Sequence, residues 1–363
     1  MNYKETFLFV SKCLTITHNK DNRHFIKEEL ESKNINWDNI VKISTNHYVF
    51  PALYCNLKRA NFLYYLPKQL VSYMKHITEL NRERNLQIIE QAKEINEILL
   101  ENNITPVFLK GTGNLLEGLY EDIAERMVGD IDFIIEKRNA DKTLDILAEN
   151  EYLYSNKMKK QIGYIKHYPR MVKKGSINAI EVHLEMTLKK FSSIFNFQII
   201  KSQLRGKDTF TLLSYEHQII HTIINKQLND YGYLYKNIAL RNYYDIFLLS
   251  FKTNTLKSID KFPTIFKQLN SFLAIASFIY PNTKSIRFEK NLKSSRYLNS
   301  ALRLIKTSQK SQNRNNIIRL YIITNYRIKL IIKALYSKSH FYYVMHKLID
   351  VKWYQRILTI DKN

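Results

Sequence analysis

Two aspartates, Asp130 and Asp132, stand two positions apart at the start of the apolar run 131–135. Successive side chains of a β-strand alternate between its two faces, so both carboxylates point to the same side. Like charges this close repel each other, and carboxylate oxygens are the ligands that Mg²⁺ and Mn²⁺ prefer. The pair therefore predicts a divalent-cation site. The alternative is a solvated strand edge whose aspartates cap a turn.

An apolar run at 107–109 precedes this pair and ends abruptly at Lys110, Gly111 and Thr112. Leucines at helical spacing follow over 115–120. A glycine turn that opens a helix presents free backbone N–H groups and the positive end of the helix dipole to a phosphate. Thr112 adds a hydroxyl, so this turn is a candidate phosphate-binding site.

Lys110 and Arg126 are the cations closest in sequence to this turn and are candidate ligands of a triphosphate. Each has an alternative role, because a carboxylate such as Asp122 or Glu125 lies nearby in the chain and would pair with it. The sequence leaves both roles open.

Together these features resemble the signature of the polymerase-beta-like nucleotidyltransferase superfamily. Leu109-Lys110-Gly111, followed by Arg126-x-x-Gly-Asp-Ile-Asp, is similar to one bacterial family assigned as nucleotidyltransferases. The resemblance is fairly specific over 105–135 and looser to about residue 250. It departs from the superfamily at Thr112, where a second Gly or Ser is usual, and in the longer gap from Gly111 to Asp130, which the narrower family shares.

A predicted hairpin carries the third acid that the resemblance implies. Its strands span 162–172 and 177–186, joined by a turn at Gly175. Alternation places Glu181, His183 and Glu185 on one face. Glu181 matches the superfamily's third carboxylate, and Glu185 is its competitor. His183 accompanies the acid in the similar family, and its alternative role is a partly buried histidine bonded to a neighbour.

The resemblance implies an enzyme that transfers a nucleoside monophosphate from an NTP to an acceptor hydroxyl and releases pyrophosphate. It implies two Mg²⁺ ions, with Mn²⁺ as a possible substitute. The implied catalytic and metal-binding residues are Asp130, Asp132 and Glu181, with His183 as an accessory residue. The implied nucleotide-binding residues are Lys110, Gly111, Thr112 and Arg126.

Composition and periodicity predict an α+β protein with helical flanks, and the resemblance implies that its core is a small mixed-sheet nucleotidyltransferase core. The expected parts are a helical region at 1–102, the core at 103–212 and a helical, strongly basic region at 213–363. Only 8 Gly and 6 Pro among 363 residues favour long helices with few turns. Helical spacing is clearest at 67–102, 240–249 and 315–338. Within 240–249, Leu240-Arg241 and Asp245 resemble a segment of the similar family that is a candidate nucleotide contact. The preferred interpretation is an ordinary i, i+4 ion pair between Arg241 and Asp245.

Two cysteines at no metal-type spacing, no recognisable signal peptide and no apolar stretch long enough to span a bilayer predict a cytoplasmic protein.

Positive charge is concentrated in the last third of the chain. Of the net +23, residues 251–363 carry +18, from 22 Lys/Arg and 4 Asp/Glu. This region is a candidate contact surface for a polyanion such as RNA. Arg319, Arg327 and Lys333, interleaved with tyrosines, are its candidate contacts. An anionic membrane surface is a less favoured partner, and a core helix with a solvated basic face is the alternative without a partner.

The acceptor is not identified by the sequence. An RNA end such as that of a tRNA, a protein hydroxyl and a small molecule all remain open, and the charge favours RNA. The competing hypothesis is an inactive nucleic-acid-binding protein with this core. The complete set of three acids argues against inactivity.

Overall fold

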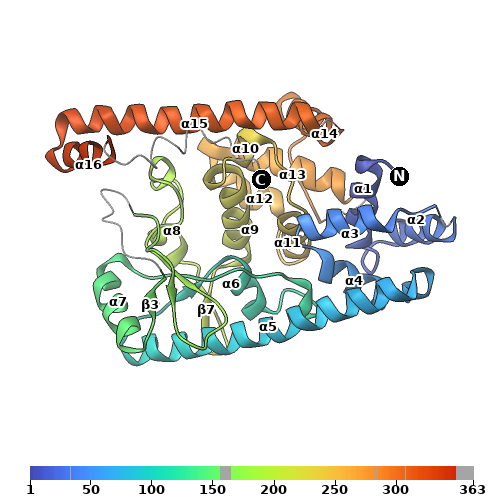
Figure 1. The fold of residues 1–363 in the computed structure, drawn as a ribbon, viewed down its shortest axis with the longest axis horizontal. Helices are drawn as coiled ribbons and strands as arrows, with labels where there is room; N and C mark the ends of the chain where they lie inside the picture. Colours follow the sequence, from blue (N-terminus) through green and yellow to red (C-terminus); the bar gives the residue numbers. More distant parts are fainter. Residues whose placement is uncertain (33, 156–164, 282, 284, 307, 349–363) are drawn as a thin grey trace.

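The computed structural model describes residues 1–348 except 33, 156–164, 282, 284 and 307. At its centre is a seven-stranded mixed sheet with short strands. In spatial order these are β3 (Leu153–Tyr154), β4 (Met171–Val172), β5 (Ile180–His183), β2 (Ile131–Ile134), β1 (Val107–Phe108), β7 (Phe210–Leu212) and β6 (Arg205–Lys207). Helices lie before and after this sheet in the chain, so the predicted α+β class is confirmed (Figure 1).

The two longest strands, β2 and β5, run parallel and side by side. Their register pairs Asp132 with Glu181 and Phe133 with Val182. Because side chains alternate across a strand, the two acids lie on one face of the sheet. Phe133 and Val182 lie on the other face and are buried in the core. The hydrophobic face therefore fixes the side to which the acids point.

Helices of the first hundred residues end in one that runs the length of the molecule (Figure 1). They are α1 (Tyr3–Cys13), α2 (Lys20–Glu31), α3 (Trp37–Asn46), α4 (Phe50–Arg59), the 3₁₀ turn η1 (Leu63–Tyr65) and α5 (Lys68–Glu101). On α5, Asn81 and Asn85 lie one helical turn apart and both donate to the main-chain carbonyl of Arg126. This helix therefore holds the loop that leads into β2.

Short helices connect and flank the strands of the sheet. They are α6 (Lys110–Glu117), the 3₁₀ turns η2 (Ile123–Glu125) and η3 (Lys137–Asn139), α7 (Ala140–Glu149), the 3₁₀ turn η4 (Lys189–Phe191) and α8 (Phe197–Lys201). An added Cβ at Gly113 of α6 would lie 2.7 Å from the carbonyl oxygen of Phe108. Only glycine permits α6 to approach β1 this closely.

Helices follow the sheet to the end of the described chain. They are α9 (Tyr215–Ile224), the π-helical turn η5 (Asn225–Asn229), α10 (Gly232–Tyr235), α11 (Leu240–Ser250), α12 (Thr255–Asp260), the 3₁₀ turn η6 (Pro263–Ile265), α13 (Phe266–Ile279), α14 (Leu292–Lys306), α15 (Ser308–Tyr336) and α16 (Lys338–Leu348). The long helix α15 lies on the side of the molecule opposite α5 (Figure 1). None of the described helices is long and apolar enough to cross a bilayer.

The sheet differs from its prediction mainly at its edges. The strand expected to lead into the glycine turn is only Val107–Phe108. Of the predicted hairpin strand at 162–172, residues 171–172 form β4, and 162–164 lie outside the described part. The edge strands β3 and β6–β7 were not predicted, because two or three residues are too few to show alternation.

Candidate active site

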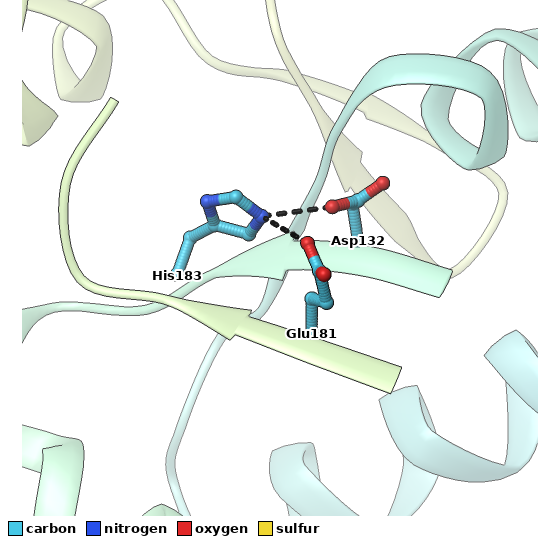
Figure 2. Close-up of side chains that lie close together, drawn as sticks. All are labelled: Asp132, Glu181 and His183. Atoms are coloured by element: carbon cyan, nitrogen blue, oxygen red, sulfur yellow. Dashed lines mark hydrogen bonds and ion pairs between the residues drawn. The ribbon is translucent and has the colours of Figure 1, made fainter. Parts of the chain in front are cut away.

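Asp132, Glu181 and His183 form a compact buried cluster on β2 and β5 (Figure 2). His183 Nε2 lies 2.8 Å from Asp132 Oδ1 and 3.6 Å from Glu181 Oε2. One ligand atom from each residue lies within 4.8 Å of the other two. Two carboxylates and an imidazole at this spacing are a donor set that fits a divalent cation. The other ring nitrogen, Nδ1, is buried without a hydrogen-bond partner among the described residues.

Lys110 provides the positive charge closest to this cluster. Its Nζ lies 2.5 Å from Asp132 Oδ1 and 3.7 Å from Glu181 Oε2. Burial lowers the pKa of Lys110, but the charge of Asp132, the hydrogen bond to it and the charge of Glu181 together outweigh burial, so the pKa lies above its usual value. The backbone of Lys110 is left-handed, with φ of 53°. A non-glycine residue costs about 1–3 kcal/mol in such a conformation, which is tolerated mostly at functional sites.

Glu181 is held ionised by its neighbours. Burial raises its pKa, but the hydrogen bond from His183 and the charge of Lys110 outweigh it and bring the pKa below its usual value. Glu185, the competitor, leaves the cluster because β5 ends at His183. Its carboxylate pairs with Lys137. The structure therefore brings Glu181 to Asp132 and leaves Glu185 out.

Asp130 lies beside the cluster and is linked to it by Arg170. Arg170 Nη2 lies 2.7 Å from Asp130 Oδ2, and Arg170 Nε lies 3.1 Å from Glu181 Oε1. Burial raises the pKa of Asp130, and the nearby charges of Glu181 and Asp132 add to this, while Arg170 opposes it. Arg170 was not predicted as a site residue; its place on the strand entering the hairpin was the only signal that it faces the acids.

The glycine turn positions the acids instead of presenting a hydroxyl. Thr112 is fully buried, and its Oγ1 donates to the carbonyl of Asp130 at 3.1 Å. Gly111 lines a cleft beside the acids. In this structure the Thr112 hydroxyl bonds the start of β2, and its role toward a phosphate stays a prediction.

Arg126 is neutralised by an acid far away in the sequence. Its Nη2 lies 3.0 Å from Asp245 Oδ2 on α11, and both side chains are almost completely buried. Tyr120 donates to the other oxygen of Asp245 at 2.7 Å. The expected i, i+4 pair of Arg241 with Asp245 is thus wrong, since Arg126 holds this carboxylate. The alternative partners of Arg126 are engaged elsewhere, Glu125 by Arg59 and Asp122 by Arg82.

A cleft of about 440 Å³ is lined by Asp130 and Asp132 and by residues of α9, α11 and the segment between these helices. Pockets of this size hold small molecules and cofactors. Besides Lys110, three half-buried cations line it: Lys166, Lys226 and Arg241.

None of these three cations forms an ion pair with a carboxylate in the described part of the chain. Burial lowers the pKa of each, and for Arg241 it lowers the pKa to about 10. Arg241 lies over the ring of Tyr48 and donates to the carbonyl of Met127 at 3.1 Å. Desolvated cations without acid partners are expected to bind an anionic ligand. Lys166 and Lys226 were not predicted, because no motif marks them.

The predicted polyanion contacts lie apart from this cleft. Arg319, Arg327 and Lys333 are all on α15, and none of them lines the cleft.

A model of a protein family described as "Uncharacterised nucleotidyltransferase" matches residues 33–280. The chain belongs to this family. The nucleotidyltransferase match spans the acid cluster and the cleft and ends at the C-terminus of α13. No curated protein matches the chain.

Two crystal structures of proteins from Helicobacter pylori are distantly similar. One is described as a "putative nucleotidyltransferase", with 14% sequence identity, coverage of 66% of this chain and 96% of that chain, and a TM-score of 0.28. The other is JHP933, with 13% identity, coverage of 70% and 98%, and a TM-score of 0.29. Similarity this low carries no argument about the site.

Proposed function

We propose that this nucleotidyltransferase is an active, metal-dependent enzyme that transfers a nucleoside monophosphate from an NTP to an acceptor hydroxyl, as in the polymerase-beta-like superfamily. One observation carries the proposal: Asp130 and Asp132, beside Glu181 and His183, line the same cleft as three cations that have no carboxylate partner among the described residues. The carboxylates are suitable ligands for metal ions, and the cations are suitable ligands for a triphosphate. An inactive nucleic-acid-binding protein would not need acids and cations that line the same cleft.

Each residue has a distinct role in the proposed reaction. Asp130, Asp132 and Glu181 would hold the Mg²⁺ ions, with His183 orienting Asp132 or completing the donor set. Bound metal supplies positive charge that stabilises the attacking and leaving oxygens during in-line displacement. Lys110, which neutralises Asp132 in this structure, is placed to contact a phosphate oxygen as well.

Glu181→Gln is expected to lower the transfer rate by at least about 100-fold, since it removes a charged ligand from the cluster. The matched control is Glu185→Gln, four positions along the chain, where the buried acid pairs with Lys137. That variant should keep most of the wild-type rate. Initial rates of label transfer from an NTP measure both. Equal losses in the two variants would contradict the assignment of Glu181.

Arg241→Met is expected to weaken NTP binding by about 10- to 100-fold, because one charge-assisted hydrogen bond contributes about 1.5–3 kcal/mol. Arg241→Lys should recover part of the affinity. Lys27→Met, on an exposed face of α2 where the side chain pairs with Glu31, is the control. Calorimetric titration with a non-hydrolysable NTP gives the Kd. An unchanged Kd for Arg241→Met would remove this residue from the triphosphate site.

For the acceptor we propose an RNA hydroxyl, since residues 251–307 alone carry +9, from 11 Lys/Arg and 2 Asp/Glu, which favours a polyanionic substrate. The test incubates the enzyme with each α-labelled NTP, Mg²⁺ and either total cellular RNA or total protein. Label in RNA supports the proposal, and label in protein replaces RNA with a protein hydroxyl. Label only in small molecules leaves a small-molecule acceptor. No label in any fraction, with NTP binding intact, would favour the inactive binding protein.

A further inference from the structure

The long helix α15 exposes an apolar stripe to solvent. Half of the exposed large apolar side chains among the described residues lie between 317 and 348. Nine of them on α15 are each at least 50% exposed. Tyr326 and Tyr336 lie on other sides of the helix, and the other seven, which form the stripe, are Ile317, Leu320, Tyr321, Ile328, Ile331, Ile332 and Leu335. At about 100° per residue they fall within an arc of about 120°, and Thr324 is the only polar residue of 320–335 in that arc. Exposed apolar patches of this kind mark interaction surfaces.

The charge around this stripe has one sign. Residues 308–348 contain eight Lys/Arg and no Asp or Glu. The helix is fixed to the body of the protein near its start, where Arg314 donates to the carbonyls of Leu234 and Tyr235. An apolar stripe on a helix that carries basic residues and no acids fits a partner that is both apolar and anionic.

We propose that the exposed stripe of α15 docks on an anionic membrane surface. Interfacial helices bury an apolar face at the boundary between headgroups and acyl chains and use Lys and Arg to bind anionic headgroups. Tyr321 suits the headgroup level, where tyrosine is enriched.

Two other partners fit the stripe less well. Nucleic acid binds through cations and stacked aromatic rings, but the centre of this stripe is aliphatic, at Ile328, Ile331 and Leu335. A second copy of the chain would bring two acid-free basic helices together, which costs electrostatic energy. The arc is also wider than the narrow seam of a two-stranded coiled coil.

The test measures co-sedimentation of the full chain with vesicles of phosphatidylcholine alone or mixed with phosphatidylglycerol. We expect wild-type protein to bind the anionic vesicles at least about tenfold more tightly, with weaker binding at high salt. Ile328→Ser with Ile331→Ser should weaken this binding at least about tenfold. The matched control is Leu80→Ser with Leu86→Ser, two α5 side chains that are 49% and 50% exposed.

Both double variants should retain nucleotidyl transfer in the absence of vesicles, which shows that they fold. Three results would overturn the proposal. One is no preference for anionic vesicles, and another is equal binding by the two double variants, since charge alone would then suffice. The third is evidence of another partner for the stripe. That evidence would be either a dimer that depends on the apolar residues in lipid-free sedimentation or displacement of vesicles by RNA.

Discussion

Replacing Asp132 with asparagine is expected to lower nucleotidyl transfer by roughly 10³-fold or more. Metal-bound charge stabilisation is worth several kcal/mol in such reactions, and each 1.4 kcal/mol is a factor of ten in rate. Asp132 is the shared member of the site, because both Lys110 Nζ and His183 Nε2 lie within 2.8 Å of its Oδ1. Loss of its charge therefore affects every part of the cluster at once.

The same variant reports on stability. From the sequence alone, removing one of two crowded carboxylates should leave stability unchanged or slightly higher. The structure alters this expectation, since Lys110 already compensates Asp132. We expect the free energy of unfolding to fall by about 1–2 kcal/mol. The loss is limited because Lys110 still has Glu181 as an ionic partner, with 3.7 Å between Nζ and Oε2. Asp145→Asn, at an exposed site on α7, is the control. Activity retained in a folded Asp132→Asn protein would contradict the proposed site.

Replacing Asp245 with alanine is expected to cause the largest loss of stability, about 3–5 kcal/mol. The change leaves the guanidinium of Arg126 buried without a carboxylate, and it removes the acceptor of Tyr120. Breaking a buried ion pair by removing one partner typically costs this much. Calorimetric thermal unfolding should show a fall in Tm on the order of 10 °C.

A double variant distinguishes the ion pair from simple loss of packing. Arg126→Leu with Asp245→Leu removes both charges, so it should recover much of the stability lost in Asp245→Ala. Asp260→Ala, an exposed acid on α12, should unfold close to the wild-type temperature. A double variant less stable than Asp245→Ala would show that the charges do not govern this site.

The pairing of acids could be predicted because strand alternation is a local property. Asp130, Asp132 and Glu181 are assigned to faces by their own neighbours in sequence. Alternation alone would also place Glu185 on the face that carries Glu181. In the structure Glu185 is separated from the acid cluster because β5 ends at His183. The choice between the two acids thus depended on where one strand stops, which the sequence does not mark.

Long-range partners could not be predicted in this way. Arg126 has acids within four residues, yet it pairs with Asp245, which lies on a helix beyond the sheet. Lys166 and Lys226 reach the cleft only because segments far apart in the sequence pack together around it. Such contacts depend on packing between elements, and no local pattern encodes them. The helical spacing of α15 was visible, but the sequence did not show that its apolar face is exposed.

The most direct test of the central claim compares transfer from NTPs labelled at the α-phosphate with transfer from NTPs labelled at the γ-phosphate. With Mg²⁺ present, we predict that the acceptor gains label only from the α-phosphate, that pyrophosphate is released, and that EDTA and Asp132→Asn each abolish the signal. Label arriving from the γ-phosphate, or α-label transferred equally well by Asp132→Asn, would contradict the account.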